Sequence, residues 1–294
     1  ATASARSQWS PIAGKENISI AHDKDQAMVT AEHYLEHVTA ETRVATIIQT
    51  SPVVGMAVDV KKIAGAIRSK SPDCFIIVDS IQHAAHGVMD IGAIGVDGCA
   101  VSGYKVFSRH NYGVAWVSPR LSTLRHEKLD GTADNFWELG TRDTGAFATF
   151  SEVVNYLEWL GSQLTGSTDQ RTRLETAGRA MAEQEQHLVD VAINGAEGRT
   201  GIRDLPGAFI LGGADNPHRE GLVSYAFTNK PSIDVVSELN ERGIRTHLRK
   251  ADYFSGSVLT PLDMDSCIRT SFCHYNSKQE VLMLLDALNE IISA

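Results

Sequence analysis

Two charged residues follow predicted strands at positions where a parallel sheet binds ligands. The run CFIIVDS is apolar and rich in β-branched residues, which predicts a buried strand with Asp79 at its carboxyl end. Gln82 comes three residues later, and Lys105 closes the strand-and-turn pattern VSGYK. Ligands of open parallel sheets lie outside the carboxyl ends of the strands. The sequence therefore predicts a ligand site at this edge.

These side-chain types together fit the needs of pyridoxal 5′-phosphate (PLP). An acid keeps the pyridine nitrogen protonated so that the ring withdraws electrons, and an amine reacts with the aldehyde. A donor to the phenolic oxygen and hydroxyls for the phosphate complete such a site. The residues that can fill these roles, in that order, are Asp79, Lys105, Gln82, Ser102 and Tyr104. Singly, an Asp after a strand is as often a cap, and a lone Lys is usually a solvated charge, so only the joint pattern indicates PLP.

The elements that must position these residues alternate between short β-rich runs and longer helical patterns from about Arg43 onward. This alternation is typical of βαβ units and a parallel sheet. The predicted strands are RVATIIQTSP, CFIIVDS, GVDGCAVSGYK and YGVAWVSP. Between the first two, VDVKKIAGAIRSK places its apolar residues on one helical face, and a long helix is expected to begin near Ala146. We expect an α/β fold with a mostly parallel sheet in the large domain.

The C-terminal part has a different character. A charged helical pattern comes first, and two strand patterns, GLVSYAFTN and CIRTSFCHY, then alternate with two helical ones, PSIDVVSELNERG and SKQEVLMLLDALNEII. These patterns predict a smaller α+β domain. The predicted domains are a PLP-binding large domain at 1–167, a connecting helix at 168–195 and a C-terminal small domain at 196–294.

The composition limits the classes of partner. The chain has 294 residues, and its 27 basic and 36 acidic residues give a formal net charge of −9, with no run of Lys or Arg typical of nucleic-acid binding. It has no apolar stretch near the ~20 residues of a membrane helix, and no signal-peptide layout at its start. Four scattered cysteines form no CxxC pair. We expect a soluble cytoplasmic protein without a metal site that binds neither nucleic acid nor membranes.

Three stretches resemble class V aminotransferases, which are fold type I PLP enzymes, and in particular their cysteine-desulfurase-like and isopenicillin-N-epimerase-like branch. The first, VDSIQHAAHGVMDIGAIGVDGCAVSGYKVFSRHNYGVAWV, looks like the central motif of that family. The others, FWELGTRDTGAFATFSEVVNYLEWLG and CIRTSFCHYNSKQEVLMLLDAL, resemble its ExGTxN segment and its C-terminal motif. The resemblance runs from about Thr42 to the end. It implies a PLP-dependent transferase-like fold.

The resemblance also implies how the cofactor is held. Lys105 would be the Schiff-base lysine and proton shuttle, Asp79 would pair with the pyridine nitrogen, and Gln82 would face the phenolic oxygen. Ser102 and Tyr104 would bind the phosphate, and Tyr104 stands where many members have His.

Two further roles concern the partner subunit and the substrate. By the resemblance, Thr141 would reach the phosphate bound by a neighbouring subunit, which implies a homodimer with shared active sites. Arg269 would bind the α-carboxylate of a small amino-acid substrate, because guanidinium suits bidentate contacts. His86 would line the substrate pocket, although a structural histidine is an equal alternative.

The chain departs from the family pattern in three places. The glycine-threonine phosphate loop of relatives, which precedes the position equivalent to residue 1, is not visible. Either an N-terminal portion is missing, or the cofactor is held by fewer contacts and binds more weakly. The loop that carries the persulfide-forming cysteine corresponds to about HLRKADYFSGSV, which has no cysteine. The turn after Lys105 reads Ser108-Arg109-His110-Asn111 instead of GPxG, and the Asn common near Pro52 is absent. The altered turn would either tune substrate choice or only reshape the surface.

Three functions remain open from the sequence. The first is a PLP enzyme that acts on a small amino acid as a C–S lyase, with cysteine-desulfurase-like chemistry but no persulfide cysteine. The second is a class V aminotransferase or an amino-acid epimerase, which would use the same residues. The third is an inactive structural homologue, against which the presence of Asp79, Gln82 and Lys105 argues.

Overall fold

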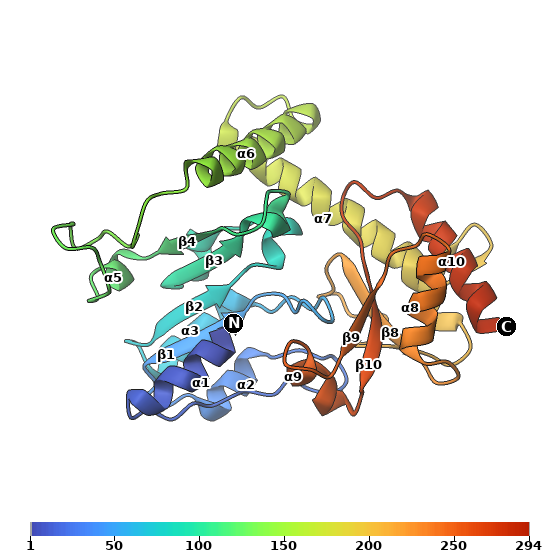
Figure 1. Cartoon of the computed structure of the whole chain (residues 1–294), viewed down its shortest axis with the longest axis horizontal. Helices are drawn as coiled ribbons and strands as arrows, with labels where there is room; N and C mark the ends of the chain where they lie inside the picture. The colour runs from blue at the N-terminus through green and yellow to red at the C-terminus, as the bar shows by residue number, and fades with distance from the viewer. Residues whose placement is uncertain (1, 294) are drawn as a thin grey trace. The chain divides into compact units, whose positions relative to one another are not determined.

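The computed structural model describes residues 2–293, and the chain divides into two compact units (Figure 1). The first unit holds the residues up to Ser19, Thr30–Gln49 and Asp59–Gly178, and the second holds Ile20–Val29, Thr50–Val58 and the residues from Arg179 onward. The division falls inside one long helix, α7 (Gln170–Asn194). It also assigns two segments of the first sixty residues to the second unit, which no local pattern indicates. The predicted domain limits stay a prediction.

The first unit contains a four-stranded sheet in the order β1-β2-β3-β4. Strands β1, β2 and β3 run parallel, and β4 is antiparallel to β3. This confirms the predicted α/β class with a mostly parallel sheet. The elements of the first unit are α1 (Thr2–Ile12), α2 (Ala31–His37), β1 (Val44–Ile48), α3 (Val60–Lys70), β2 (Phe75–Asp79), η1 (His83–Ala85), α4 (Ile91–Ile94), β3 (Gly98–Ser102), η2 (Gly103–Val106), β4 (Gly113–Val117), α5 (Pro119–Ser122), α6 (Thr144–Leu164) and the first part of α7.

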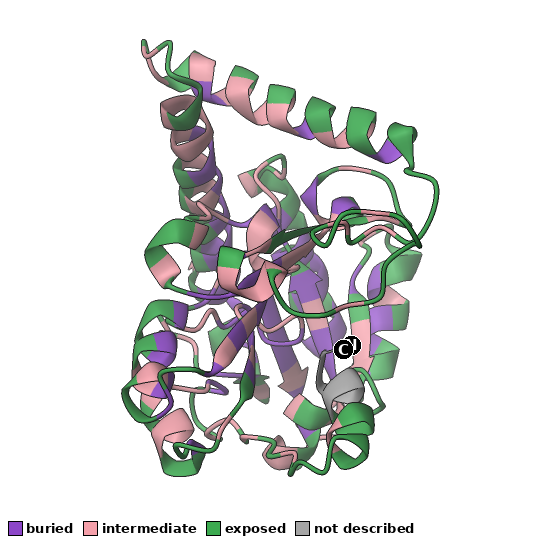
Figure 2. Cartoon of the chain, turned by 90° about the vertical axis from the view of Figure 1, so that its left-hand side faces the viewer, coloured by how far each residue is buried: buried purple, intermediate pink, exposed green. Residues whose placement is uncertain are grey.

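Helix α3 shows why this sequence forms a layer next to the sheet. Its N-cap, Asp59, accepts a hydrogen bond from the backbone N–H of Lys62 at 3.0 Å. The helix buries one apolar face, and the alternate residues Ile76 and Val78 of β2 are also buried. A buried Ile or Val contributes roughly 1.5–3 kcal/mol relative to an exposed one. Figure 2 shows buried residues gathered on the strands. Apolar burial therefore stabilises the strands whose carboxyl ends carry the candidate site.

At the opposite, amino-terminal edge of this sheet, a buried carboxylate accepts hydrogen bonds from several elements. Asp97 directly precedes β3 and is only 3% exposed. Its Oδ2 accepts hydrogen bonds from Arg68 of α3 at 2.9 Å, from Arg120 of α5 at 2.8 Å and from the backbone N–H of Ile76 at 2.9 Å. Because each donor comes from a different element, Asp97 joins two helices and a strand at one point.

The helices α6 and α7 approach each other closely at Gly161. A Cβ added there would lie 2.0 Å from the backbone oxygen of Arg173, which belongs to α7. Gly65, inside α3, would place its Cβ in open space. The two helical glycines therefore offer a matched pair for substitution.

We expect Gly161→Ala to destabilise the first unit by about 1–3 kcal/mol, because the helices must separate to admit the methyl group. Gly65→Ala is expected to stabilise it by about 0.5–1 kcal/mol, since alanine favours an exposed helix interior. All four tryptophans lie in the first unit, so urea unfolding followed by tryptophan fluorescence reports on that unit. Equal midpoints for Gly161→Ala and the unchanged protein would contradict the close approach.

The second unit is built on an antiparallel sheet in the order β7-β8-β10-β9. Buried residues of α7, α8 and α10 join one face of this sheet in an apolar core with Tyr225 of β8, which is fully buried. The remaining elements of the second unit are β5 (Gly195–Ala196), β6 (Arg199–Thr200), η3 (Ile202–Asp204), β7 (Ala208–Ile210), β8 (Leu222–Phe227), α8 (Ser232–Glu241), β9 (His247–Lys250), α9 (Gly256–Leu259), η4 (Thr260–Leu262), β10 (Ser266–Ser271) and α10 (Lys278–Ser293).

The segment Thr50–Val58 is held to the second unit through its backbone carbonyl groups. The buried guanidinium of Arg219 donates to the carbonyl of Val54 at 3.0 Å, and the Ser224 hydroxyl donates to the carbonyl of Val53. Burial lowers the pKa of Arg219 to about 10. These contacts explain why a segment far away in the sequence joins this unit.

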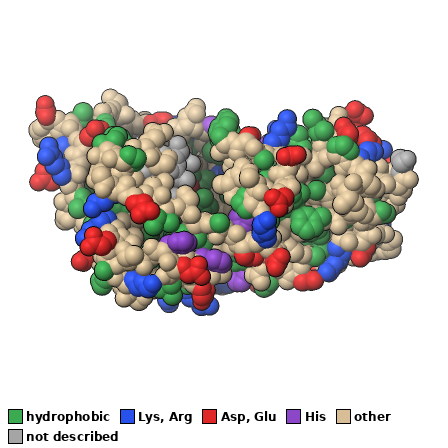
Figure 3. Space-filling model, turned by 90° about the horizontal axis from the view of Figure 1, so that it is seen from below, with side chains coloured by type: hydrophobic (Ala, Val, Ile, Leu, Met, Phe, Trp, Pro, Cys, Tyr) green, Lys and Arg blue, Asp and Glu red, His purple; other side chains and the backbone are tan. Residues whose placement is uncertain are grey.

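Two properties of the chain bear on its environment. Among residues 2–293, no helix combines the length and the apolar character that crossing a bilayer requires. Figure 3 shows one face of the molecule, on which acidic and basic side chains are interspersed.

Candidate active site

The carboxyl ends of β2 and β3 bring together the polar residues that the sequence singled out. Asp79 is the last residue of β2, where it pairs with Ile48 of β1 and Ala100 of β3. Its Oδ1 accepts a hydrogen bond from the backbone N–H of Ile81 at 3.1 Å. That bond holds the half-buried carboxylate at the strand end and orients it locally.

Lys105 and Gln82 are in direct contact, and Gln82 follows Asp79 by three residues in the chain. The Lys105 Nζ donates to the Gln82 Oε1 at 2.8 Å, and the Gln82 Nε2 lies 2.7 Å from the Nε2 of His86. Gln82 precedes the short helix η1, and Lys105 lies in η2, which packs against η1. The structure therefore joins three of the predicted site residues, Gln82, Lys105 and His86, in one hydrogen-bonded group, and Asp79 lies at the end of the strand that precedes Gln82.

The two candidate phosphate-binding residues, Ser102 and Tyr104, closely precede Lys105 in the chain. Ser102 ends β3, and in the described part of the chain its hydroxyl does not cap η2. Tyr104 is 44% exposed; its ring stacks on His110 at a centroid distance of 4.6 Å, and the Lys105 Nζ lies 5.7 Å from the ring centroid. Gly103 lies between them at a position that has no room for a side chain, because a Cβ there would lie 2.3 Å from the ring of Tyr112. Both side chains thus come from the segment that carries Lys105.

The remaining two predicted site residues, Thr141 and Arg269, belong to other segments of the chain. Thr141 is exposed on the segment between α5 and α6, two residues before Asp143, the N-cap of α6. Arg269 belongs to β10 in the second unit, where its Nη1 donates to the carbonyl of Pro52 at 2.8 Å. The predicted roles of these two residues stay predictions.

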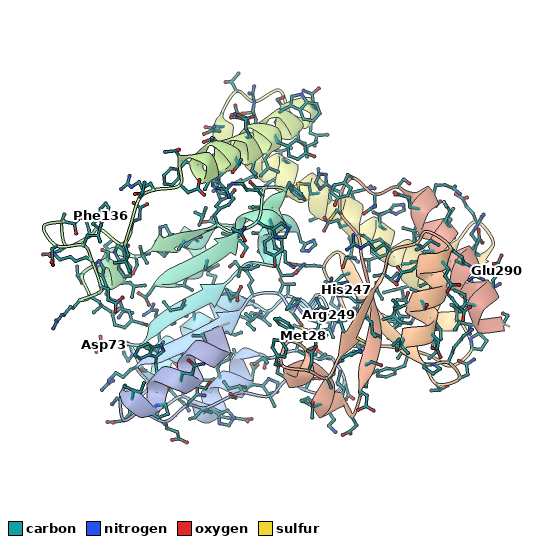
Figure 4. The ribbon with its side chains drawn as sticks, viewed as in Figure 1. Met28, Asp73, Phe136, His247, Arg249 and Glu290 are labelled. Carbon is teal, nitrogen blue, oxygen red and sulfur yellow. The ribbon has the colours of Figure 1, made fainter. Side chains whose placement is uncertain are left out.

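Arg269 has basic neighbours on its own sheet. In the antiparallel pairing of β9 and β10, Arg269 lies opposite His247, and Cys267 lies opposite Arg249. Alternate residues of a strand point to the same face, so Arg269, His247 and Arg249 share one face of this sheet. Figure 4 labels His247 and Arg249 on β9. The sequence predicts a loop here, because four residues with three basic side chains give no clear apolar alternation, and the structure has a strand.

Two polar residues at the same sheet edge, Ser80 and Gln49, are not identified by the sequence. Ser80 is fully buried; its hydroxyl donates to the Oε1 of Gln49 at 2.6 Å and lies 3.2 Å from the sulfur of Cys99. Gln49 directly follows β1, and its backbone N–H donates to the carbonyl of Asp79. Their position after a strand was the only available signal, and it does not distinguish a supporting residue from a turn residue.

The cysteines offer little nucleophilic reactivity. Cys74, Cys99 and Cys267 are buried and Cys273 is half-buried, and all four are free thiols. Burial raises the pKa of Cys267 to about 11, because its effect outweighs the opposite effects of the Ser224 hydroxyl and of Arg249 and Arg269. The nucleophile in thiol chemistry is the thiolate, so a raised pKa makes a thiol inert.

We expect Cys267 to resist alkylation in the folded protein. At pH 8, a thiol with a pKa near 11 has a thiolate fraction about 100-fold lower than one with the ordinary value of 9.0. Iodoacetamide followed by mass spectrometry should label Cys273 first and Cys267 only after unfolding in urea. Rapid labelling of Cys267 without urea would show that its thiol is accessible and ionised.

The donor set of the first unit fits PLP. It comprises a lysine amine, a carboxylate at a strand end, an amide and a hydroxyl that is not used as a helix cap, and these are the four groups that the aldehyde, ring nitrogen, phenolic oxygen and phosphate require. All come from the carboxyl ends of two neighbouring strands. The described residues hold no group of three or more His, Cys, Asp or Glu side chains that could bind a metal ion.

The sequence is similar to characterised proteins over nearly all of its length. The family profile described as aminotransferase class-V matches residues 2–284. A cysteine desulfurase-like protein, ustD of Aspergillus flavus, is 24% identical over 294 residues, and the match covers 97% of this chain but only 61% of that protein. The chain therefore spans about three fifths of the length of this relative.

Solved structures agree at the level of the fold. The apo cysteine desulfurase of Thermococcus onnurineus NA1 superposes with a TM-score of 0.78 at 18% identity, covering 99% of this chain and 70% of that one. The cysteine desulfurase CsdA of Escherichia coli superposes with a TM-score of 0.74 at 20% identity, and the match covers 95% of this chain and 66% of that one. Both neighbours share the fold type I architecture that the sequence predicted. Since the family profile covers almost the entire sequence, the chain belongs to the aminotransferase class-V family.

Proposed function

We propose that the chain is a PLP-dependent enzyme that acts on a small amino acid through Lys105, and that its reaction is a C–S lyase reaction. The observation that carries the proposal is the hydrogen bond from Lys105 to Gln82, which lies three residues after Asp79 at the carboxyl end of β2. Support for a sulfur-containing substrate comes from the relatives whose names describe cysteine desulfurases.

Each residue of this cluster has a definite task in the proposal. Lys105 would hold the cofactor covalently and, once its amine is free, would remove the proton from the substrate Cα. Asp79 would keep the ring nitrogen protonated, and the Gln82 amide would donate to the phenolic oxygen. Bound PLP supplies an electron-withdrawing ring that stabilises negative charge at the substrate Cα.

The other predicted residues would orient the ligands. Ser102 and Tyr104 would bind the phosphate from the segment that carries Lys105. Arg269 would bind the substrate α-carboxylate through two parallel N–H donors.

A second copy of this chain is proposed as the partner. Thr141 is exposed on the segment before α6, which would allow it to bind the phosphate held by the other copy. Light scattering should then give twice the mass of one chain, and Thr141→Ala should weaken PLP binding about tenfold, the cost of one charge-assisted hydrogen bond. A monomer that binds PLP with unchanged affinity in this variant would contradict the shared site.

The proposed reaction needs no thiol from the protein. The residues of the expected persulfide loop, 247–258, contain no cysteine, and the thiol of Cys267 is buried. Cleavage of the bond between Cβ and sulfur in cysteine, followed by hydrolysis, would release sulfide, pyruvate and ammonia in equal amounts.

The test is to load the protein with PLP and to incubate it separately with cysteine, cystine and alanine. The proposal expects pyruvate and ammonia from cysteine together with sulfide. Sulfide with alanine in place of pyruvate would indicate desulfurase chemistry, a keto acid formed from alanine would indicate an aminotransferase, and racemised alanine would indicate an epimerase. Absence of any cofactor absorbance change on PLP addition would overturn the proposal as a whole.

A further inference from the structure

A buried histidine stands behind the amide that contacts Lys105. His86 is 6% exposed and follows η1, four residues after Gln82. Its Nε2 lies 2.7 Å from the Gln82 Nε2, and the Gln82 Oε1 lies 2.8 Å from the Lys105 Nζ. One amide therefore bridges the imidazole and the amine.

The chemistry of the three groups fixes where the protons are. A lysine ammonium can only donate, so the amide atom that it meets is the oxygen. The other end of the amide is then the NH₂ group, which also can only donate. The Nε2 of His86 must consequently accept, and a neutral His86 carries its proton on Nδ1.

The opposite arrangement is unfavourable. If His86 carried a proton on Nε2, the amide would have to turn its oxygen toward the imidazole and its NH₂ group toward the ammonium of Lys105. Two donors would then face each other at hydrogen-bond distance. Because His86 is buried, water has little access to relieve the mismatch at that end, and a mispaired buried polar group is costly.

We propose that His86 is a positioning residue that holds the Gln82 amide with its oxygen toward Lys105 and its NH₂ group toward the imidazole. The NH₂ group has two hydrogens, and His86 takes one, so the second remains for an anionic oxygen. This last step rests on the proposed function, in which Gln82 donates to the phenolic oxygen of PLP. In this role His86 acts through Gln82 and does not contact the substrate, which differs from the pocket-lining role expected from the sequence.

The first test is made on the unchanged protein without cofactor, and a variant serves only to assign its signals. In protein labelled with ¹⁵N-histidine and free of PLP, the chemical shifts of the two imidazole nitrogens of His86 report which one carries the proton. The His86→Gln variant assigns the signals by their loss. We expect an unprotonated Nε2 near neutral pH, and a proton on Nε2 would overturn the proposal.

The second test measures the amine through its reactivity. Competitive reductive methylation of cofactor-free protein, read by mass spectrometry, gives the rate at Lys105 relative to the exposed Lys62. Gln82→Leu removes the acceptor and should speed methylation of Lys105 about tenfold, because the charged form is less favoured. His86→Phe, which leaves the amide free to turn, should speed it about threefold.

Two further variants separate positioning from packing. His86→Gln keeps an acceptor, so the methylation rate of Lys105 in this variant should be close to the rate in the unchanged protein. His187→Phe removes an exposed histidine of α7 and should leave the rate as it is. A rate for His86→Phe equal to that of the unchanged protein, while Gln82→Leu still gives a faster one, would refute the positioning role. If no PLP binds at all, the proposed function fails, but the proton position and the methylation rates still decide this proposal.

Discussion

Replacing Lys105 with alanine is expected to abolish covalent capture of PLP. Lys105 is the amine held at the carboxyl edge of the sheet by Gln82, and alanine has no group that can react with an aldehyde. Turnover of the best substrate should fall by at least about 10³-fold, as for removal of a covalent catalyst from other enzymes. The measurement is borohydride reduction of PLP-loaded protein, followed by peptide mass spectrometry to locate the modified lysine.

A matched lysine variant controls for nonspecific modification. Lys62, on the exposed face of α3, pairs with Asp59 at 3.5 Å and carries the same charge as Lys105. Lys62→Ala should keep the reduced adduct at Lys105 and the full turnover. An adduct that persists in Lys105→Ala at the unchanged level, attached to another lysine, would show that the candidate site is in the wrong place.

The sequence predicted the parts of the fold that rest on apolar burial. The strand β2 stands out as a continuous apolar, β-branched run that ends at Asp79, and the helix α3 stands out because its apolar residues share one face. Strand β9 could not be predicted, since three of its four residues are basic or histidine. The sequence also did not predict that Thr50–Val58 belongs to the second unit. It depends on the contact between Arg219 and Val54, which lie 165 residues apart in the chain.

The candidate site was predictable only in part, for a related reason. Asp79 and Lys105 could be assigned to one edge because parallel strands end on the same side of a sheet. The contact between Gln82 and His86 could not, since a histidine four residues after a glutamine has many structural roles. What distinguishes His86 is its burial together with the distance to the amide, and both arise only when η1 packs against η2.

Replacing Asp97 with alanine is expected to give the largest loss of stability in the first unit. Removal of a buried acid whose partners remain costs about 3–5 kcal/mol. The cost is smaller here because Arg68 and Arg120 keep 31% and 38% of their side-chain surface in solvent, where water can solvate them. We therefore expect a loss of about 2–4 kcal/mol, part of which arises because the backbone N–H of Ile76 loses its acceptor. Urea unfolding followed by tryptophan fluorescence measures this loss.

Asp97→Asn separates charge from hydrogen bonding. The amide keeps an acceptor of the same shape but lacks the negative charge, so the loss should be smaller, about 1–2 kcal/mol. A midpoint for Asp97→Ala that equals that of the unchanged protein would show that the arginines and Ile76 do not depend on this carboxylate.

The pH dependence of this difference has a definite sign. Burial on its own would raise the pKa of Asp97, but hydrogen bonds from Arg120, the Ile76 backbone and Arg68 outweigh it, so the pKa lies below the ordinary value of 3.8. The folded state therefore binds this proton less readily than the unfolded chain. The stabilisation is complete above the unfolded pKa and is lost as the pH falls through the lower, folded pKa. The stability gap between the unchanged protein and Asp97→Asn should accordingly be constant from about pH 7 to pH 5 and should shrink below about pH 4. A gap that widened on acidification would mean that protonation of Asp97 favours the fold, contrary to the hydrogen bonds that its carboxylate accepts.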